Sequence, residues 1–289
     1  MRFLFTFVAL SGIGAVSVFA QNTKPAPVIE IVRETIKEGR GAAHEKVETD
    51  YAAVFRKANH PAHYVAMATV SGPQEVWFLQ PMPSFAISED YDKASEKEPL
   101  KSALAMMDSR DGELRASSRN IWAVLRPDLS YGVDKFNPGK SRFVMVGMFH
   151  VRIGHEEEFA AGGKQYLDAF AKAGIEECTL AYQVVAGAPG GTYLFFTMMD
   201  SMKYLDGYPA RMQAIQQAMG AETYSRFMKG GGDIFSSIDQ TLFQVKPGMS
   251  YVTQDMLDAD PAFWKPKPVA AKPASAAAPA APEKKAAAQ

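Results

Sequence analysis

The sequence contains the same unit twice, and this internal repeat constrains the fold more than any other feature. Residues 28–72 align onto residues 143–187 at a constant offset and without a gap. After short insertions the register continues to the end of each copy, where residues 126–131 meet residues 246–251. We infer a tandem duplication of a unit of about 105 to 110 residues, the size of one domain. Identical residues coincide along the alignment: Gly39 with Gly154, Tyr51 with Tyr166, and Phe55 with Phe170.

Hydrophobic periodicity predicts the same order of elements in both copies. An extended apolar run opens each copy, and apolar residues at helical spacing follow it. Two short strands joined by a glycine-rich turn come next, then a second helical region and a final strand. The order β-α-β-β-α-β is that of a ferredoxin-like unit. The predicted strands are Val28–Lys37, Tyr64–Val70, Val76–Gln80 and Ile121–Leu125 in the first copy, and Arg142–Arg152, Leu180–Val185, Tyr193–Thr197 and Thr241–Val245 in the second.

The predicted strands are apolar on both faces, whereas the helices of a ferredoxin-like unit cover only one face of its sheet. A sheet that is apolar on both faces has to bury both. We therefore predict an α+β fold of two tandem ferredoxin-like units packed sheet-to-sheet. The opening strand of the second copy shows the pattern, with Val144, Val146 and Met148 alternating with Phe143, Met145 and Phe149.

The two ends of the chain differ from the repeats. Arg2, the apolar run Phe3–Val18 and the small residues at Val18 and Ala20 predict a signal peptide, so we expect an exported protein, periplasmic or secreted. The last segment is rich in Ala, Pro and Lys and is expected to be disordered. The predicted division is 1–20 signal peptide, 21–136 first unit, 137–252 second unit, 253–264 short connector and 265–289 disordered tail.

Composition excludes several function classes. With 31 Lys and Arg against 32 Asp and Glu the formal net charge is −1, so we expect no nucleic-acid partner. The single cysteine, Cys178, excludes a disulfide framework and a cysteine zinc cluster, and a small buried residue is expected there. No later apolar stretch predicts a transmembrane segment in the mature chain. We expect a monomeric pseudo-dimer, with further dimerisation left open.

Three segments of the second copy carry short structural motifs. Val151–Phe159 is the end of a strand, an Arg-x-Gly turn and an acidic helix start, and Tyr182–Gly187 with Tyr193–Phe196 forms a hairpin pattern. In these motifs the chain resembles the dimeric α+β barrel superfamily, which includes NIPSNAP-like proteins and antibiotic-biosynthesis monooxygenases. The resemblance covers residues 28–251. It implies that the two ferredoxin-like units, packed sheet-to-sheet, form a pseudo-dimeric α+β barrel. It also implies a small-molecule cavity between sheet and helices or inside the barrel, but no single activity.

His150 is the candidate catalytic residue. It lies on the first strand of the second copy, two positions before Arg152. A strand histidine that faces a cavity can act as a general base or as an axial haem ligand, and the alternative is a histidine of the core or the rim. The resemblance implies that haem enzymes of the family need a histidine on the second helix or a loop. The predicted second helix, Tyr208–Ser237, contains none, so haem is disfavoured and no cofactor is predicted.

The candidate ligand-binding residues are Trp77, Trp122, Arg152 and Tyr182. Leucines replace both tryptophans in the second copy. Two indoles on neighbouring strands can form an aromatic wall for a flat organic ligand, and the alternative is ordinary sheet core. Arg152 and Tyr182 belong to the motifs that carry the resemblance.

A histidine and acidic residues begin the first helix of each copy, as His44 to Glu48 and as His155 to Glu158. This spacing can hold a metal, but no second histidine follows, and acidic residues in a first helical turn complement the helix dipole. We expect solvated helix starts and no metal site. His60 and His63 are expected to be turn residues.

The predicted function is an exported binding module for a small apolar or aromatic molecule. The alternative is a cofactor-independent monooxygenase-like or related small-molecule enzyme, in which His150 is the base and Trp77 or Trp122 positions the substrate. A second alternative is a cell-envelope interaction protein targeted by its basic tail. The sequence leaves open whether the chain is an enzyme.

Overall fold

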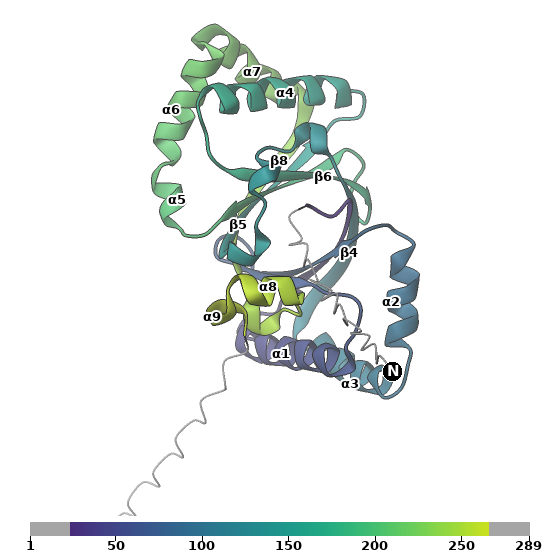
Figure 1. The fold of residues 1–289 in the computed structure, drawn as a ribbon. Helices are drawn as coiled ribbons and strands as arrows, with labels where there is room; N and C mark the ends of the chain where they lie inside the picture. Colours follow the sequence, from purple (N-terminus) through teal and green to yellow (C-terminus); the bar gives the residue numbers. More distant parts are fainter. Residues whose placement is uncertain (1–23, 266–289) are drawn as a thin grey trace, which may run out of the picture.

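The computed structural model describes residues 24–265, which form one closed antiparallel β-barrel with helices packed around it (Figure 1). The predicted signal peptide and nearly all of the predicted tail lie outside the described residues. The strands are β1 (Val28–Ile36), β2 (Val65–Thr69), β3 (Glu75–Met82), β4 (Arg115–Leu125), β5 (Phe143–Val151), β6 (Cys178–Ala186), β7 (Thr192–Met199) and β8 (Phe235–Val245). The helices are α1 (Gly41–Ala58), α2 (Ile87–Ser95), α3 (Leu100–Gly112), α4 (Glu156–Lys172), α5 (Lys203–Asp206), α6 (Tyr208–Met219), α7 (Ala221–Ile234), α8 (Gln254–Ala259) and α9 (Pro261–Trp264).

Both halves of the chain place their strands in the same order around the barrel. The order is β1-β3-β2-β8-β5-β7-β6-β4, so each half contributes a sheet in which its first and third strands are central. The two sheets join where β2 pairs with β8 and where β4 pairs with β6. This arrangement confirms the predicted α+β fold of two ferredoxin-like units in a pseudo-dimeric barrel.

All eight predicted strands form, and the main differences are at their boundaries. β4 and β8 begin several residues earlier than predicted. The prediction missed these starts because the first residues of both strands are polar and exposed and show no apolar alternation. The helix predicted over Tyr208–Ser237 is two helices, α6 and α7. They are separated by Gly220, whose positive φ of 80° ends the first helix.

Alternation along the strands separates two apolar layers. On β1, Ile29 and Ile31 belong to the core inside the barrel, whereas Val32 and Ile36 pack on the outer side among residues covered by helices. α1 and α3 lie on one side of the barrel and α4, α6 and α7 on the opposite side (Figure 1). Both faces of the sheet are therefore buried, as the apolar pattern of the strands predicts.

The residues predicted to be a short connector fold onto the end of the barrel. α8 and α9 occupy most of 253–264, and Trp264 joins the core inside the barrel. The Trp264 indole donates a hydrogen bond to the carbonyl oxygen of Gly139 at 2.7 Å. In residues 24–265, no helix combines the length and apolar character that a membrane crossing requires.

We expect the Leu194→Ala variant to reduce the free energy of unfolding by about 2–5 kcal/mol, because Leu194 is fully buried between the two halves and its truncation leaves a cavity. Denaturant unfolding measures this change. Ile153→Ala is the control, since Ile153 is 89% exposed and its change should stay within about 0.5 kcal/mol. Equal losses in the two variants would contradict the described core.

Candidate functional site

A cavity of about 340 Å³ lies on the outer face of the first-half sheet, where α1 ends and α2 packs. Its floor comes from β1, β3 and β4, and its cover comes from α1, α2 and the loop after α1. Four aromatic residues line it: Phe55, Tyr64, Tyr91 and Trp122. The other lining residues are Glu30, His60, Ala62, Gln80, Ser88, Asp92, Ser95 and Asn120.

Glu30 is the carboxyl group at the floor of this cavity. Strand register places Glu30 between Gln80 on β3 and Trp122 on β4. The Asn120 amide donates a hydrogen bond to Glu30 Oε1 at 3.0 Å, and the Gln80 amide donates one to Oε2 at 3.4 Å. Burial raises the pKa of Glu30 above its usual value, and the nearby charge of Asp92 adds to this effect.

His60 lies in the predicted turn, but it is buried and fixed by hydrogen bonds. Its Nδ1 accepts a hydrogen bond from the backbone N–H of Ala62 at 3.2 Å. The ring proton of the neutral form is therefore on Nε2, which faces the carbonyl oxygen of Tyr91 at 3.2 Å and Ser95 Oγ at 3.1 Å. Burial lowers the pKa of His60. A neutral His60 thus connects the loop to α2, and both ring nitrogens are occupied.

The predicted catalytic residue, His150, lies away from this cavity. It is at the end of β5, where its Nδ1 is 2.9 Å from Thr192 Oγ1. The Thr192 hydroxyl donates to the carbonyl oxygen of Pro189, so the His150 Nδ1–H donates to Thr192. Arg152 follows the strand and is exposed. Neither residue lines the 340 Å³ cavity.

The structure does not bring the two predicted tryptophans together. β3 and β4 both pair with β1 and do not pair with each other, so their indoles are not on neighbouring strands. Trp77 points into the barrel, where its Nε1 donates to Glu75 Oε2 at 2.9 Å. Trp122 is on the outer face and lines the cavity. Tyr182 is also inside the barrel, and its hydroxyl donates to the carbonyl oxygen of Ala26.

A second, smaller cavity of about 170 Å³ is polar and lies at one end of the barrel interior. Arg33 makes two hydrogen bonds to the Glu75 carboxylate, at 2.8 and 2.9 Å. This pairing uses the Arg33 guanidinium and leaves Arg119 as the other cation of the cavity. The lining residues are Arg33, Thr35, Glu75, Ser117 and Arg119.

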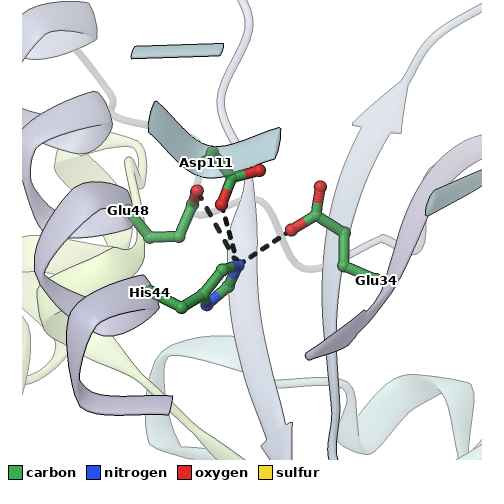
Figure 2. Close-up of side chains that lie close together, drawn as sticks. All are labelled: Glu34, His44, Glu48 and Asp111. Carbon is green, nitrogen blue, oxygen red and sulfur yellow. Dashed lines mark hydrogen bonds and ion pairs between the residues drawn. The ribbon is translucent and has the colours of Figure 1, made fainter. Parts of the chain in front are cut away.

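A buried group of ionisable side chains lies between β1, α1 and α3 (Figure 2). We call it the His44 cluster: Glu34, His44, Glu48 and Asp111. Figure 2 shows the three carboxyl groups pointing at the His44 ring. His44 Nε2 is 2.9 Å from Glu34 Oε2, 3.4 Å from Asp111 Oδ1 and 3.9 Å from Glu48 Oε1.

The prediction of a solvated helix start is wrong for His44 and Glu48. The helix begins at Gly41, which turns both side chains toward the sheet, and His44 is 1% exposed. In the second half the prediction holds: His155 pairs at 2.6 Å with the exposed Glu158 at the start of α4. Two of the four cluster residues, Glu34 and Asp111, were not among the predicted candidates, because only the tertiary structure brings them to α1.

Charges within the His44 cluster are unevenly compensated. Burial alone would raise the pKa of Glu34, but hydrogen bonds from His44 and Arg115 hold it below the usual value. Burial and the carboxylates of Glu34 and Asp111 raise the pKa of Glu48 to about 9. Burial and Glu34 also raise the pKa of Asp111. Arg115 pairs with Glu34 and Asp111 and not with Glu48.

Cys178 is buried in the core inside the barrel, as expected. Burial raises the pKa of its thiol to about 11, so the thiolate is scarce at neutral pH.

No family model and no curated protein sequence matches this chain. Solved structures do. An anthrone oxidase-like protein has a TM-score of 0.52 at 15% identity, over 78% of this chain and 93% of the other. A putative monooxygenase from Fusobacterium nucleatum has a TM-score of 0.50 at 9% identity, over 76% and 93%. A mutant chlorite dismutase from Candidatus Nitrospira defluvii has a TM-score of 0.50 at 8% identity, over 81% and 96%. These similarities show that the chain has the fold of dimeric α+β barrel proteins.

The burial of His60 predicts a pH dependence of the free energy of unfolding. Because its pKa in the folded protein is below the usual 6.5, the unfolded chain binds more protons near that pH. The contribution of neutral His60 to the free energy of unfolding is fully present above pH 6.5 and is lost as the pH falls. The free energy of unfolding then decreases by at most about 1.4 kcal/mol per pH unit for one proton. Denaturant unfolding at pH 7.5 and 5.5 should show a smaller decrease in His60→Gln than in the wild type. An unchanged decrease in His60→Gln would contradict this assignment.

Proposed function

We propose that this protein binds a flat organic molecule, neutral or positively charged, in the 340 Å³ cavity under α2. The observation that carries the proposal is the convergence of four aromatic side chains and the Glu30 carboxyl group on one cavity. Ligand cavities of this kind combine apolar surface with a few polar groups that fix orientation, and they range from about 300 to 1,000 Å³. The predicted signal peptide supports a place of action outside the cytoplasm.

The charge of the lining residues favours one class of ligand. Two acidic residues, Glu30 and Asp92, line the cavity, and no lysine or arginine is among the described residues that do so. Aromatic faces attract cations, and carboxylates accept hydrogen bonds from ammonium or hydroxyl groups. An anionic ligand would face repulsion from both carboxylates. An aromatic amine or a neutral aromatic alcohol fits this lining best.

A second candidate function is proton abstraction from such a ligand, within a monooxygenase-like or related reaction. The names of the anthrone oxidase-like and putative monooxygenase structures, and the resemblance to antibiotic-biosynthesis monooxygenases and NIPSNAP-like proteins, support this reading. A carboxyl group with a raised pKa inside a cavity is suited to act as a base. In this cavity the base would be Glu30, because His150 lies elsewhere and His60 has both nitrogens occupied.

Ligand titrations test the binding function. Trp122 is the tryptophan in the cavity, whereas Trp77 and Trp264 are buried in the core, so a ligand should change the fluorescence of Trp122. Planar aromatic amines should bind and raise the melting temperature, and carboxylates of the same ring size should not. Trp122→Ala should weaken the binding of the amines by about 1–2 kcal/mol, roughly tenfold.

One further variant, Glu30→Gln, distinguishes the binding function from the proton-abstraction function. Glu30→Gln should weaken amine binding if the carboxylate only binds, and it should abolish turnover while leaving binding in place if Glu30 is a base. His150→Ala and Arg152→Ala are the controls and should bind as the wild type does. A loss of binding in His150→Ala with none in Trp122→Ala would place the site elsewhere and refute the proposal.

A further inference from the structure

We propose that the His44 cluster is a structural site for one divalent first-row metal ion. Its ligands favour Zn²⁺, Mn²⁺ or Fe²⁺. This site is separate from the 340 Å³ cavity and does not depend on what the cavity binds. Its four residues come from three elements: Glu34 from β1, His44 and Glu48 from α1, and Asp111 from α3. A bound ion would therefore connect the sheet to both helices of the first half.

The donor atoms already converge. One atom from each residue can be chosen so that all four lie within 4.8 Å of one another. Four ligands at metal bond lengths of about 2.0–2.2 Å would be roughly 3.4 Å apart in a tetrahedral site. Side-chain shifts of about 1 Å would bring the four donor atoms to these distances. Two of the ligands, His44 and Glu48, lie one helical turn apart on α1.

Asp111 gives an independent indication of a ligand. It is 2% exposed, and no donor in residues 24–265 makes a hydrogen bond to its Oδ1. In the metal-free cluster the N–H on His44 Nε2 is used by Glu34 Oε2 at 2.9 Å, which leaves Asp111 Oδ1 at 3.4 Å without a hydrogen bond. An ion bound at Nε2 would take the place of this proton, which would move to Nδ1. A buried carboxylate oxygen without a partner is costly, and a cation at the centre of the cluster would satisfy it.

Arg115 pairs with two carboxylates of the His44 cluster on the side away from the histidine ring. Its guanidinium pairs with Glu34 Oε1 and with Asp111 Oδ2, the oxygens that face away from His44. The other oxygen of each carboxylate faces the His44 ring. Outer contacts of this kind orient metal-binding carboxylates. Binding of a divalent cation would displace the proton that the raised pKa keeps on Glu48, and the charges of the three carboxylates, Arg115 and the cation would then sum to zero.

The second half shows that the fold does not need these polar groups. The alignment of the two copies places Phe149, Phe159 and Gly163 at the positions of Glu34, His44 and Glu48. Strand pairing makes Arg115 equivalent to Phe235, because Arg115 pairs with Ile36 and Phe235 pairs with Val151, the residue aligned with Ile36. Phe149, Phe159 and Phe235 pack together there, with ring centroids 5.5 and 5.8 Å from that of Phe235. Buried ionic groups are often replaced by packed apolar ones without loss of stability, so a polar cluster at this place requires another reason.

The ligand types select the class of metal. One imidazole with carboxylates suits Zn²⁺, Mn²⁺ or Fe²⁺. Ca²⁺ and Mg²⁺ take oxygen ligands, and Mg²⁺ usually keeps several waters, for which this buried cluster gives little access. Soft ions such as Cu⁺ prefer thiolates and thioethers, which the cluster does not contain.

Metal analysis of the full chain tests the site. The protein is dialysed against a chelator, loaded with Zn²⁺ or Mn²⁺, passed through gel filtration and analysed for metal, and the affinity is measured by calorimetry. Wild type should retain one ion per chain, gain melting temperature on loading and respond little to Mg²⁺. Asp111→Asn and Glu48→Gln keep the side-chain size and remove ligand charge, so each should lower the affinity by at least about tenfold.

Glu45→Gln is the matched control, because Glu45 is exposed on the same helix. It should bind and gain stability as the wild type does. If Asp111→Asn does not fold, Glu48→Gln gives the same comparison, since Glu48 makes the longest contact in the cluster. Failure of the wild type to retain either ion, or equal affinities in Glu48→Gln and Glu45→Gln, would show an ion-pair network only and overturn the proposal.

Discussion

The pairing of β2 with β8 and of β4 with β6 is the interaction on which the rest of the structure depends. Each half forms a four-stranded sheet with two open edges and an apolar face that its own helices leave bare. Joining the edges removes unpaired backbone groups and encloses the apolar faces in one step. The barrel interior is then filled by side chains such as Trp77, Leu194 and Phe243. The larger cavity and the His44 cluster accordingly lie in the outer layer, between sheet and helices.

The sequence predicts this fold well because its signals are local or repetitive. The internal repeat and the alternation along Phe143–His150 predict the elements and the packing of sheet on sheet, and the family resemblance implies the barrel. The sites depend on tertiary structure instead. The sequence predicts Trp77 and Trp122 to lie on neighbouring strands, but the strand order places β1 between them and the register turns them to opposite faces. A usable signal existed in the copies themselves: His44 corresponds to Phe159, so a polar residue replaces an aromatic one at a core position.

Duplication explains how one chain can bury polar groups in its first half and still fold stably. In the second half, aromatic residues fill the layer between sheet and helices, and the ring centroids of Phe159 and Tyr193 are 4.5 Å apart. Burying polar groups in the first half costs stability that an apolar filling would not cost. A barrel closed by two halves shares one interior core, so the apolar half supports the half that holds the cavity and the cluster. The asymmetry between the copies is therefore a guide to where function lies.

The cavity and the His44 cluster also share structural elements. Glu30 and Glu34 are both on the outward side of β1, about 13 Å apart at the rise of an extended strand. Between them Val32 and Phe78 pack in the same apolar cluster. α1 spans both places, because His44 lies near its beginning and Phe55, which lines the cavity, lies near its end. An ion that fixes α1 to β1 at Glu34 would also fix the angle at which Phe55 meets the cavity. A bound ion would therefore also limit the shapes of ligand that the cavity can accept.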